Sequence, residues 1–380
     1  MTTYSQAISS WAEHLRAGGT TPWSAWTSDT EQPGAAEPGN PSATHLEVAR
    51  RINRIAGRPQ VALVDLVLAV APTGRGLVDP PLAWGEPSRF GSPPVHPDAL
   101  SSEELLRVAL PVLVRLLPLV VPAEKYATRA SRFSSPWRRS VRVHGSPYAA
   151  AALIEQLREQ GVPTSSRCTH VVLARPLDVM MAEHWHMSSL RGSPARWWRV
   201  WRQAVATGSL PRGARPDRLA SRLLDSGRPV HVVVADDHDR LAELVSGVVG
   251  RPVSLPPTPD PAETDLVRRL NRLLTLRTGP DRARTLVQVL AQQVVPGARV
   301  SLTAPSAPLA VPPWARALAA ERSREMADGI RGGGYAVHGD PDDLVPTDRP
   351  GASSTVDRDR TLELALAAGV RAWQLQGGTP

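Results

Sequence analysis

Three short segments of the sequence combine the residue types and the spacing that binding or catalysis requires. Each lies between a predicted strand and a predicted helix, at 144–147, 175–178 and 236–239. Ligands of parallel sheets bind beyond the carboxyl ends of the strands, so these loops would form one edge of a site. The first loop, His-Gly-Ser-Pro, leads into a helix whose free N–H groups suit a phosphate. A phosphate site that includes Gly145 and Ser146 is one interpretation of this loop. A purely structural turn is the other, and it is favoured because Pro147 removes one donor and the loop lacks the Lys-Ser/Thr pair of a nucleotide-binding loop.

Arg175 directly follows the second predicted strand and precedes Pro176. The proline favours an extended backbone at Arg175. A guanidinium at the mouth of a sheet can hold a phosphate or a carboxylate through two parallel hydrogen bonds. It can equally pair with Asp178 or Asp236 to complete the edge of the sheet. The sequence leaves both roles open for Arg175.

Candidate acid–base residues lie in the same region. Glu183 and His184 belong to a predicted helix, and either side chain could act as a general base. His144 in the first loop is a third candidate. His184 and His186 would point roughly 200° apart on a helix, so they cannot chelate one metal ion together and we expect no metal site. A solvated helix face is the alternative interpretation of Glu183 and His184.

The elements that must position these residues alternate between strand and helix. Apolar runs predict strands at 141–143, 169–174, 229–235 and 335–338. Helical spacing and capping residues predict intervening helices at 148–160, 177–187, 194–206 and 237–249, and later ones at 263–274, 280–294, 314–330 and 358–375. This order predicts an α/β fold, with a parallel sheet and helices on both of its faces.

The region before the first strand has a different character. Helical patterns at 4–17, 61–70 and 101–117 are separated by Pro/Gly-rich stretches, and a Ser/Arg-rich segment at 123–139 is the best candidate linker. We therefore divide the chain into a mainly helical accessory region, 1–135, an α/β core, 136–300, and a helix–strand–helix part, 301–380, that completes the core.

Composition excludes several classes of protein. The chain has 380 residues, of which 42% are hydrophobic and 21% charged, so a disordered or fibrous protein is excluded. The single cysteine, Cys168, excludes an internal disulfide and a cysteine-based zinc site. No secretory leader and no apolar run of membrane-spanning length is recognisable. We expect a cytoplasmic protein without a membrane partner.

The net charge of +8 is carried almost entirely by arginine, since Lys125 is the one lysine. An arginine-rich composition of this kind is typical of high-GC bacterial genomes. A basic binding face is the alternative, and it would use Arg138, Arg139, Arg268, Arg269 and Arg272. We favour the compositional explanation, which makes nucleic acid the less favoured partner.

Residues 141–346 resemble bacterial sulfotransferase-like proteins of high-GC Gram-positive organisms. The likeness rests on the order and spacing of four stretches, 170–175, 229–235, 267–273 and 314–346. It implies a P-loop-type α/β fold and 3′-phosphoadenosine 5′-phosphosulfate as the cofactor. It further implies that Arg175 contacts the 3′-phosphate. The loop from His144 to Tyr148 would be the 5′-phosphosulfate loop, with Gly145, Ser146 and Tyr148 as cofactor-binding residues.

The sequence departs from this family at two positions that matter for the cofactor. The family's loop contains a lysine and a Gly-Thr-Thr-like sequence that neutralise charge during sulfuryl transfer, and this loop has neither. The serine that the family has eight residues after the arginine is Glu183 here. A carboxylate at that position would repel a phosphate. The resemblance therefore implies a degenerate cofactor loop.

Three hypotheses about function follow, and they leave open whether the protein is an enzyme. The first is a sulfotransferase-like protein that binds a nucleotide, a phosphate or another small molecule, or serves as a scaffold, with a protein partner at its N-terminal region. The second is an active sulfotransferase in which His144, Arg175 and Glu183 or His184 replace the standard groups. The third is a protein that binds polyanions or nucleic acid.

Overall fold

The computed structural model describes residues 4–27, 41–73, 82, 95–120, 140–162, 168–302 and 306–377. The chain packs as two compact units. Unit 1 comprises Met1–Lys125, Arg269–Pro305 and Asp357–Pro380, and unit 2 comprises Tyr126–Arg268 and Ser306–Val356. Residues 269–305 and 357–380 therefore belong to the same compact unit as the N-terminal helices. The three consecutive parts that we derived from the sequence remain a prediction about domains, and the linker at 123–139 lies outside the described residues.

Unit 1 is helical over its described residues. Its helices are α1 (Tyr4–Arg16), α2 (Trp23–Thr27), α3 (Ala43–Ala56), α4 (Val61–Leu68), α5 (Ser102–Val120), α12 (Pro280–Val289), α13 (Val295–Arg299) and α15 (Arg358–Leu375). Helix α15 packs against α5 and α3, and the apolar faces of all three are buried. This confirms the helices predicted near 4–17, 61–70, 101–117 and 358–375. Among the described residues, none of the helices combines the length and the apolar character that a membrane span needs.

Unit 2 contains a four-stranded parallel sheet in the order β1-β2-β3-β4. The strands are β1 (Ser140–Gly145), β2 (Cys168–Ala174), β3 (Val230–Val234) and β4 (Ala336–His338). The helices are α6 (Pro147–Glu159), α7 (Leu177–Leu190), α8 (Trp197–Thr207), α9 (Pro216–Leu224), α10 (His238–Val249) and α14 (Arg316–Arg331), and α11 (Pro261–Thr278) continues into unit 1. A mostly helical chain with a small parallel sheet is compatible with the predicted α/β class.

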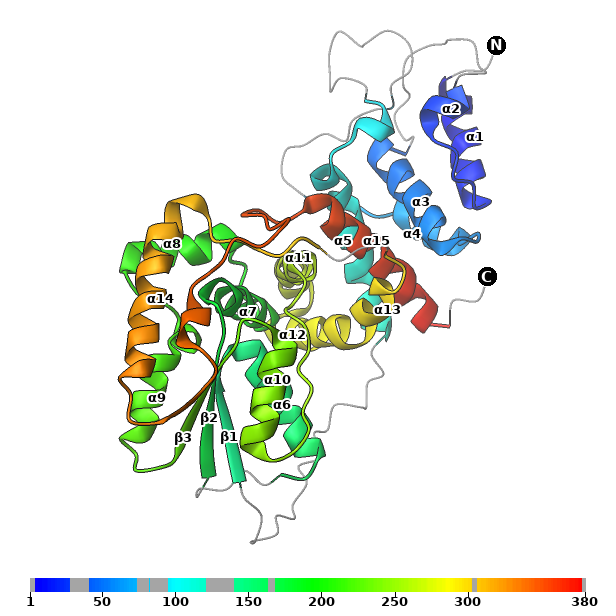
Figure 1. The fold of residues 1–380 in the computed structure, drawn as a ribbon. Coiled ribbons are helices and arrows are strands. Elements are labelled where there is room, and N and C mark those ends of the chain that lie inside the picture. Colours follow the sequence, from blue (N-terminus) through cyan, green and yellow to red (C-terminus); the bar gives the residue numbers. More distant parts are fainter. Residues whose placement is uncertain are drawn as a thin grey trace. The chain divides into compact units, whose positions relative to one another are not determined.

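Both faces of the sheet are covered by helices, as the sequence predicts. Val171 and Leu173 of β2 belong to an apolar cluster with α6 and α10. The alternate residues Val172 and Ala174 belong to a second cluster with α7, α8, α9 and α14. Figure 1 shows α9 and α14 on one side of the strands and α6 and α10 on the other. Because β2 is buried on both faces, its sequence is a continuous apolar run and not an alternating one.

Two features of unit 2 go beyond the elements predicted from the sequence. Trp197 and Trp201 of α8 are both buried in the apolar core. Helix α9, together with the short turn η2 (Arg212–Ala214) before it, was not predicted. Its nine residues are rich in charge, but Leu219, Ala220 and Leu223 keep a helical spacing that the sequence analysis missed, and they lie on a helix that packs against β2, β3 and α14.

Candidate functional site

The turn between β1 and α6 is held tightly against β2. Gly145 has a φ of 94°, and a Cβ at this position would lie 2.0 Å from the carbonyl oxygen of Leu173. The next residue, Ser146, donates its N–H to the same oxygen at 2.9 Å. Its side chain is fully buried, and Pro147 begins the helix. Only glycine permits this close approach of two backbones together with a positive φ.

The carboxylate of Glu183, from α7, lies at the start of α6. One of its oxygens accepts a hydrogen bond from the Ser146 hydroxyl and a second from the N–H of Tyr148 at 3.1 Å. The other oxygen accepts a hydrogen bond from Nη1 of Arg175 at 3.0 Å. Glu183 is completely buried. A side chain of the protein therefore occupies the position beside a helix N-terminus where an external anion would bind.

Arg175 completes this arrangement from the end of β2. Its exposed fraction is 3%, and its pairing with Glu183 makes the site electrically neutral. The Nε atom of Arg175 has no hydrogen-bond partner among the described residues. A phosphate within about 4 Å of the carboxylate would be repelled by about 4 kcal/mol per unit charge at the effective dielectric of a protein. An anion at this site would have to overcome that repulsion while Glu183 stays in place.

The structure thus brings together Gly145, Ser146, Tyr148, Arg175 and Glu183, which the sequence analysis singled out. Their assignment as cofactor ligands and as a catalytic base stays a prediction. Three of the five interact directly with Glu183, through Ser146 Oγ, Tyr148 N–H and Arg175 Nη1. The sequence analysis named the arginine and the glutamate separately and did not pair them.

The side chain of His144 contacts His170 and is not part of the Glu183 network. Its Nε2 is 2.9 Å from Nδ1 of His170 on β2, and the two rings stack with centroids 5.1 Å apart. Cys168 places its sulfur 3.8 Å from Nε2 of the same His170. The sequence analysis overlooked His170 because only the pairing of β1 with β2 puts the two imidazoles on one face.

The His144–His170 pair predicts how stability depends on pH. Burial, with a smaller contribution from nearby positive charge, lowers the pKa of both imidazoles from the ordinary value of 6.5. Between the lowered pKa values and 6.5 the unfolded chain binds more protons than the folded chain, so the free energy of unfolding should fall as the pH is lowered through that window. Urea denaturation at pH values from 8 to 5 would measure this decrease.

The matched variant for this prediction is His144→Asn combined with His170→Asn, which removes both titrating rings. We expect a smaller loss of stability below pH 6.5 in the double variant than in the wild type. An equal decrease in the two proteins would show that this pair does not contribute to the pH dependence.

His184 is partly exposed and faces a different direction from Glu183 on α7. Burial and the nearby Arg191 lower the pKa of its imidazole. In the described part of the chain the ring makes no hydrogen bond to Glu183 or Arg175. The neighbouring His186 is engaged elsewhere, since its Nδ1 is 2.9 Å from the hydroxyl of Thr264. The structure therefore does not bring His184 into the Glu183 network.

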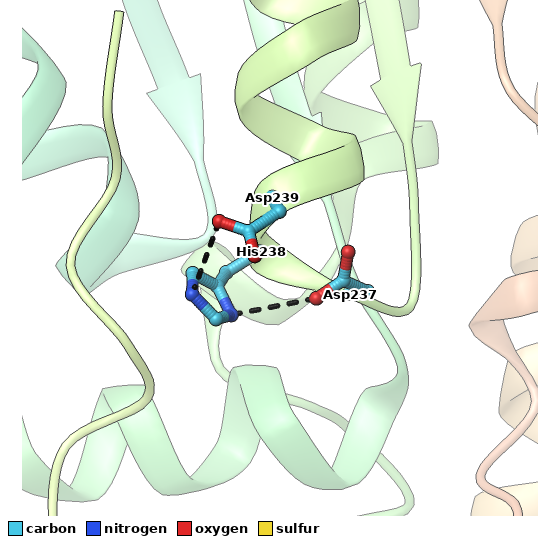
Figure 2. Close-up of side chains that lie close together, drawn as sticks. All are labelled: Asp237, His238 and Asp239. Carbon is cyan, nitrogen blue, oxygen red and sulfur yellow. Dashed lines mark ion pairs between the residues drawn. The ribbon is translucent and has the colours of Figure 1, made fainter.

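The loop after β3 gathers three potential metal ligands, Asp237, His238 and Asp239 (Figure 2). The imidazole nitrogens of His238 lie 3.4 Å from an oxygen of each aspartate. Asp237 is the N-cap of α10 and accepts the N–H of Arg240 at 2.8 Å, a bond that lowers the pKa of Asp237. Both aspartates are exposed. These contacts are those of a capped helix start on the surface.

Asp178 forms its ion pair with Arg349 and not with Arg175, the partner that the sequence analysis considered for it. Its two oxygens lie 3.3 and 3.4 Å from the guanidinium of Arg349, 171 residues further along the chain. Burial raises the pKa of the Asp178 carboxyl. The pair borders a pocket of about 220 Å³, which Arg316 and Val311 also line.

The proposed basic face is largely neutralised where the structure describes it. Arg268 donates to Asp265 at 2.6 Å, and Arg269 makes two hydrogen bonds of 2.8 Å to Glu103. Arg138 and Arg139 lie outside the described residues, as does Lys125. Two of the five arginines named for polyanion binding therefore already form ion pairs with carboxylates of the chain.

Comparison of this chain with protein-family models, with curated proteins and with solved structures finds no match. The geometry of its own residues is then the basis on which a function can be assigned.

Proposed function

We propose that the chain is a sulfotransferase-like binding or scaffold protein that does not use 3′-phosphoadenosine 5′-phosphosulfate. The supporting observation is the position of the Glu183 carboxylate. It accepts hydrogen bonds from the start of α6 and from Arg175, the two groups that the family resemblance assigns to the cofactor's phosphates. The protein would thus supply its own anion where the resemblance implies that the cofactor's phosphates bind.

The energetics of the site support this proposal. Expelling Glu183 would leave Arg175 in a buried position without its partner, and it would also break the hydrogen bonds of Ser146 and Tyr148. Loss of one member of a buried ion pair is strongly unfavourable, by about 3–5 kcal/mol. A cofactor would have to offset this cost before it gained any affinity.

An active transferase is less compatible with the same contacts. A general base needs a free oxygen within reach of the substrate's proton, whereas both oxygens of Glu183 already accept hydrogen bonds from the protein. His144 is paired with His170, and the loop contains no lysine to stabilise the charge that develops during transfer. Among the residues that the structure describes, the remaining candidate groups do not form a nucleophile–base–acid arrangement.

Calorimetric titration with 3′-phosphoadenosine 5′-phosphate tests the proposal. We expect the wild-type protein to show no Arg175-dependent binding at millimolar ligand. The variant Glu183→Ser, which restores the residue type of the family, should gain at least about tenfold in affinity because the carboxylate no longer competes with the phosphate.

The control is Glu183→Ser combined with Arg175→Met, which should lose the gained affinity. Circular dichroism would establish that each variant is folded. Micromolar binding to the wild type that disappears in Arg175→Met would contradict the proposal and would favour an active cofactor site.

A further inference from the structure

A second set of arginines surrounds a pocket of unit 2 that the proposed function does not use. The pocket has a volume of about 510 Å³ and is lined by Arg212, Arg215, Asp217, Arg218 and Arg222, together with Leu210, Ser221 and Gly329. We call it the α9 pocket, because most of these residues belong to α9 or to the turn that precedes it.

The local structure explains why the arginines converge. Arg215 is the N-cap of α9, and Arg218 and Arg222 follow it by three and seven residues. Residues at this spacing share one face of a helix. Arg212 belongs to the turn η2 directly before α9 and lines the same pocket. One helix face and its entry turn therefore contribute four guanidinium groups to a single concave surface.

The charge of the α9 pocket is not balanced by its own carboxylate. Arg215 is buried and forms two hydrogen bonds to Asp217, of 2.9 and 2.6 Å. The other three arginines are exposed, and none has an ion pair with a carboxylate in the part of the chain that the structure describes. Four arginines against one aspartate leave three uncompensated positive charges around the pocket.

Electrostatic repulsion between the arginines destabilises the α9 pocket, and a bound anion would reduce that repulsion. Arg218 and Arg222 are like charges at i and i+4 on a helix, a spacing that destabilises the helix. Guanidinium groups bind phosphate oxygens through paired hydrogen bonds, so an anion in the pocket would relieve the repulsion and satisfy the donors.

We propose that the α9 pocket binds a compact, multiply charged phosphate group, such as the di- or triphosphate part of a small molecule. The dimensions favour such a ligand over nucleic acid. Helix α9 has nine residues and is therefore about 13 Å long, enough for a short chain of phosphates. A nucleic-acid backbone would need a longer track of cations to be bound well.

Calorimetric titration with inorganic tripolyphosphate and with pyrophosphate tests this proposal on the full-length chain. We compare the wild type with the double variant Arg218→Gln/Arg222→Gln. The control is Arg199→Gln/Arg202→Gln, which removes two exposed arginines from α8, where they stack on Trp198. Both double variants lose the same charge from the same unit.

The expected result is a loss of at least about tenfold in tripolyphosphate affinity in Arg218→Gln/Arg222→Gln and a change below about twofold in the control. Binding to the wild type should weaken as salt is added. Absence of binding to the wild type at millimolar tripolyphosphate overturns the proposal, as does an equal loss in the two double variants. Tighter binding of duplex DNA than of tripolyphosphate would also overturn it, in favour of a nucleic-acid surface.

The inference is independent of the Glu183 network, because the two sets of residues do not overlap. Binding of 3′-phosphoadenosine 5′-phosphate that depends on Arg218 and Arg222, but not on Arg175, would belong to the α9 pocket. Binding that depends on Arg175 alone would contradict the proposed function and leave the α9 pocket unaffected. Thermal unfolding of each variant would confirm that the exposed substitutions leave the fold intact.

Discussion

Replacing Glu183 with alanine is expected to lower the free energy of unfolding by about 3–5 kcal/mol, measured by urea denaturation of the wild type and the variant. The substitution leaves the buried guanidinium of Arg175 without its counter-charge. It also removes the acceptor for the Ser146 hydroxyl and for the N–H of Tyr148. Buried donors that lose their partners are a second source of instability.

Two further measurements separate the charge effect from a loss of packing. The double variant Arg175→Met/Glu183→Leu removes both charges, so it should be more stable than the sum of the single substitutions implies. Sulfate should stabilise Glu183→Ala more than it stabilises the wild type, because the vacated position is an anion site between Arg175 and the start of α6. A loss below about 1 kcal/mol in Glu183→Ala, with no response to sulfate, would contradict the network.

Replacing Gly145 with alanine is expected to lower the free energy of unfolding by at least about 3 kcal/mol. The added Cβ would lie 2.0 Å from the carbonyl oxygen of Leu173, and the φ of 94° is unfavourable for alanine. Backbone atoms cannot move away as a flexible side chain can. The shift would also disturb the hydrogen bond from the Ser146 N–H to Leu173.

Gly247→Ala is the matched control for this prediction. Gly247 lies in α10, and a Cβ there would meet no atom within 4 Å. Alanine favours a helix over glycine by about 1 kcal/mol, so this variant should be slightly more stable than the wild type. The same chemical change is thus expected to have opposite effects at the two positions. A mild effect at Gly145 would show that the turn between β1 and α6 can relax.

Both predictions concern contacts between residues that are distant in sequence. Ser146 and Glu183 are 37 residues apart, and they meet because β1 and β2 pair in parallel, so that the loop after β1 lies beside the helix that follows β2. The sequence identified both residues and the departure from the family at Glu183. It did not show that the carboxylate of Glu183 accepts hydrogen bonds from Ser146 and Tyr148 at the start of α6.

The arginines of the α9 pocket were not singled out from the sequence. The arginines at 212, 215, 218 and 222 repeat at helical spacing, which is a readable signal in the sequence. It was passed over because α9 itself was not predicted, and the arginine-rich composition of the chain makes any such group inconspicuous. Recognition required the helix to be placed beside α14, whose Gly329 completes the lining.

The sequence by itself determined much of the local structure of this protein. Apolar runs, helix caps and glycine or proline boundaries placed β2, β3, α6, α10 and α15 close to their observed bounds, because such preferences depend on neighbouring residues. The tertiary structure alone decided the partners of the charged groups: Glu183 for Arg175, and Arg349 for Asp178. Ion pairs form between whatever charges the packing of apolar surfaces brings within reach, and hydrophobic periodicity carries no information about which charges those are.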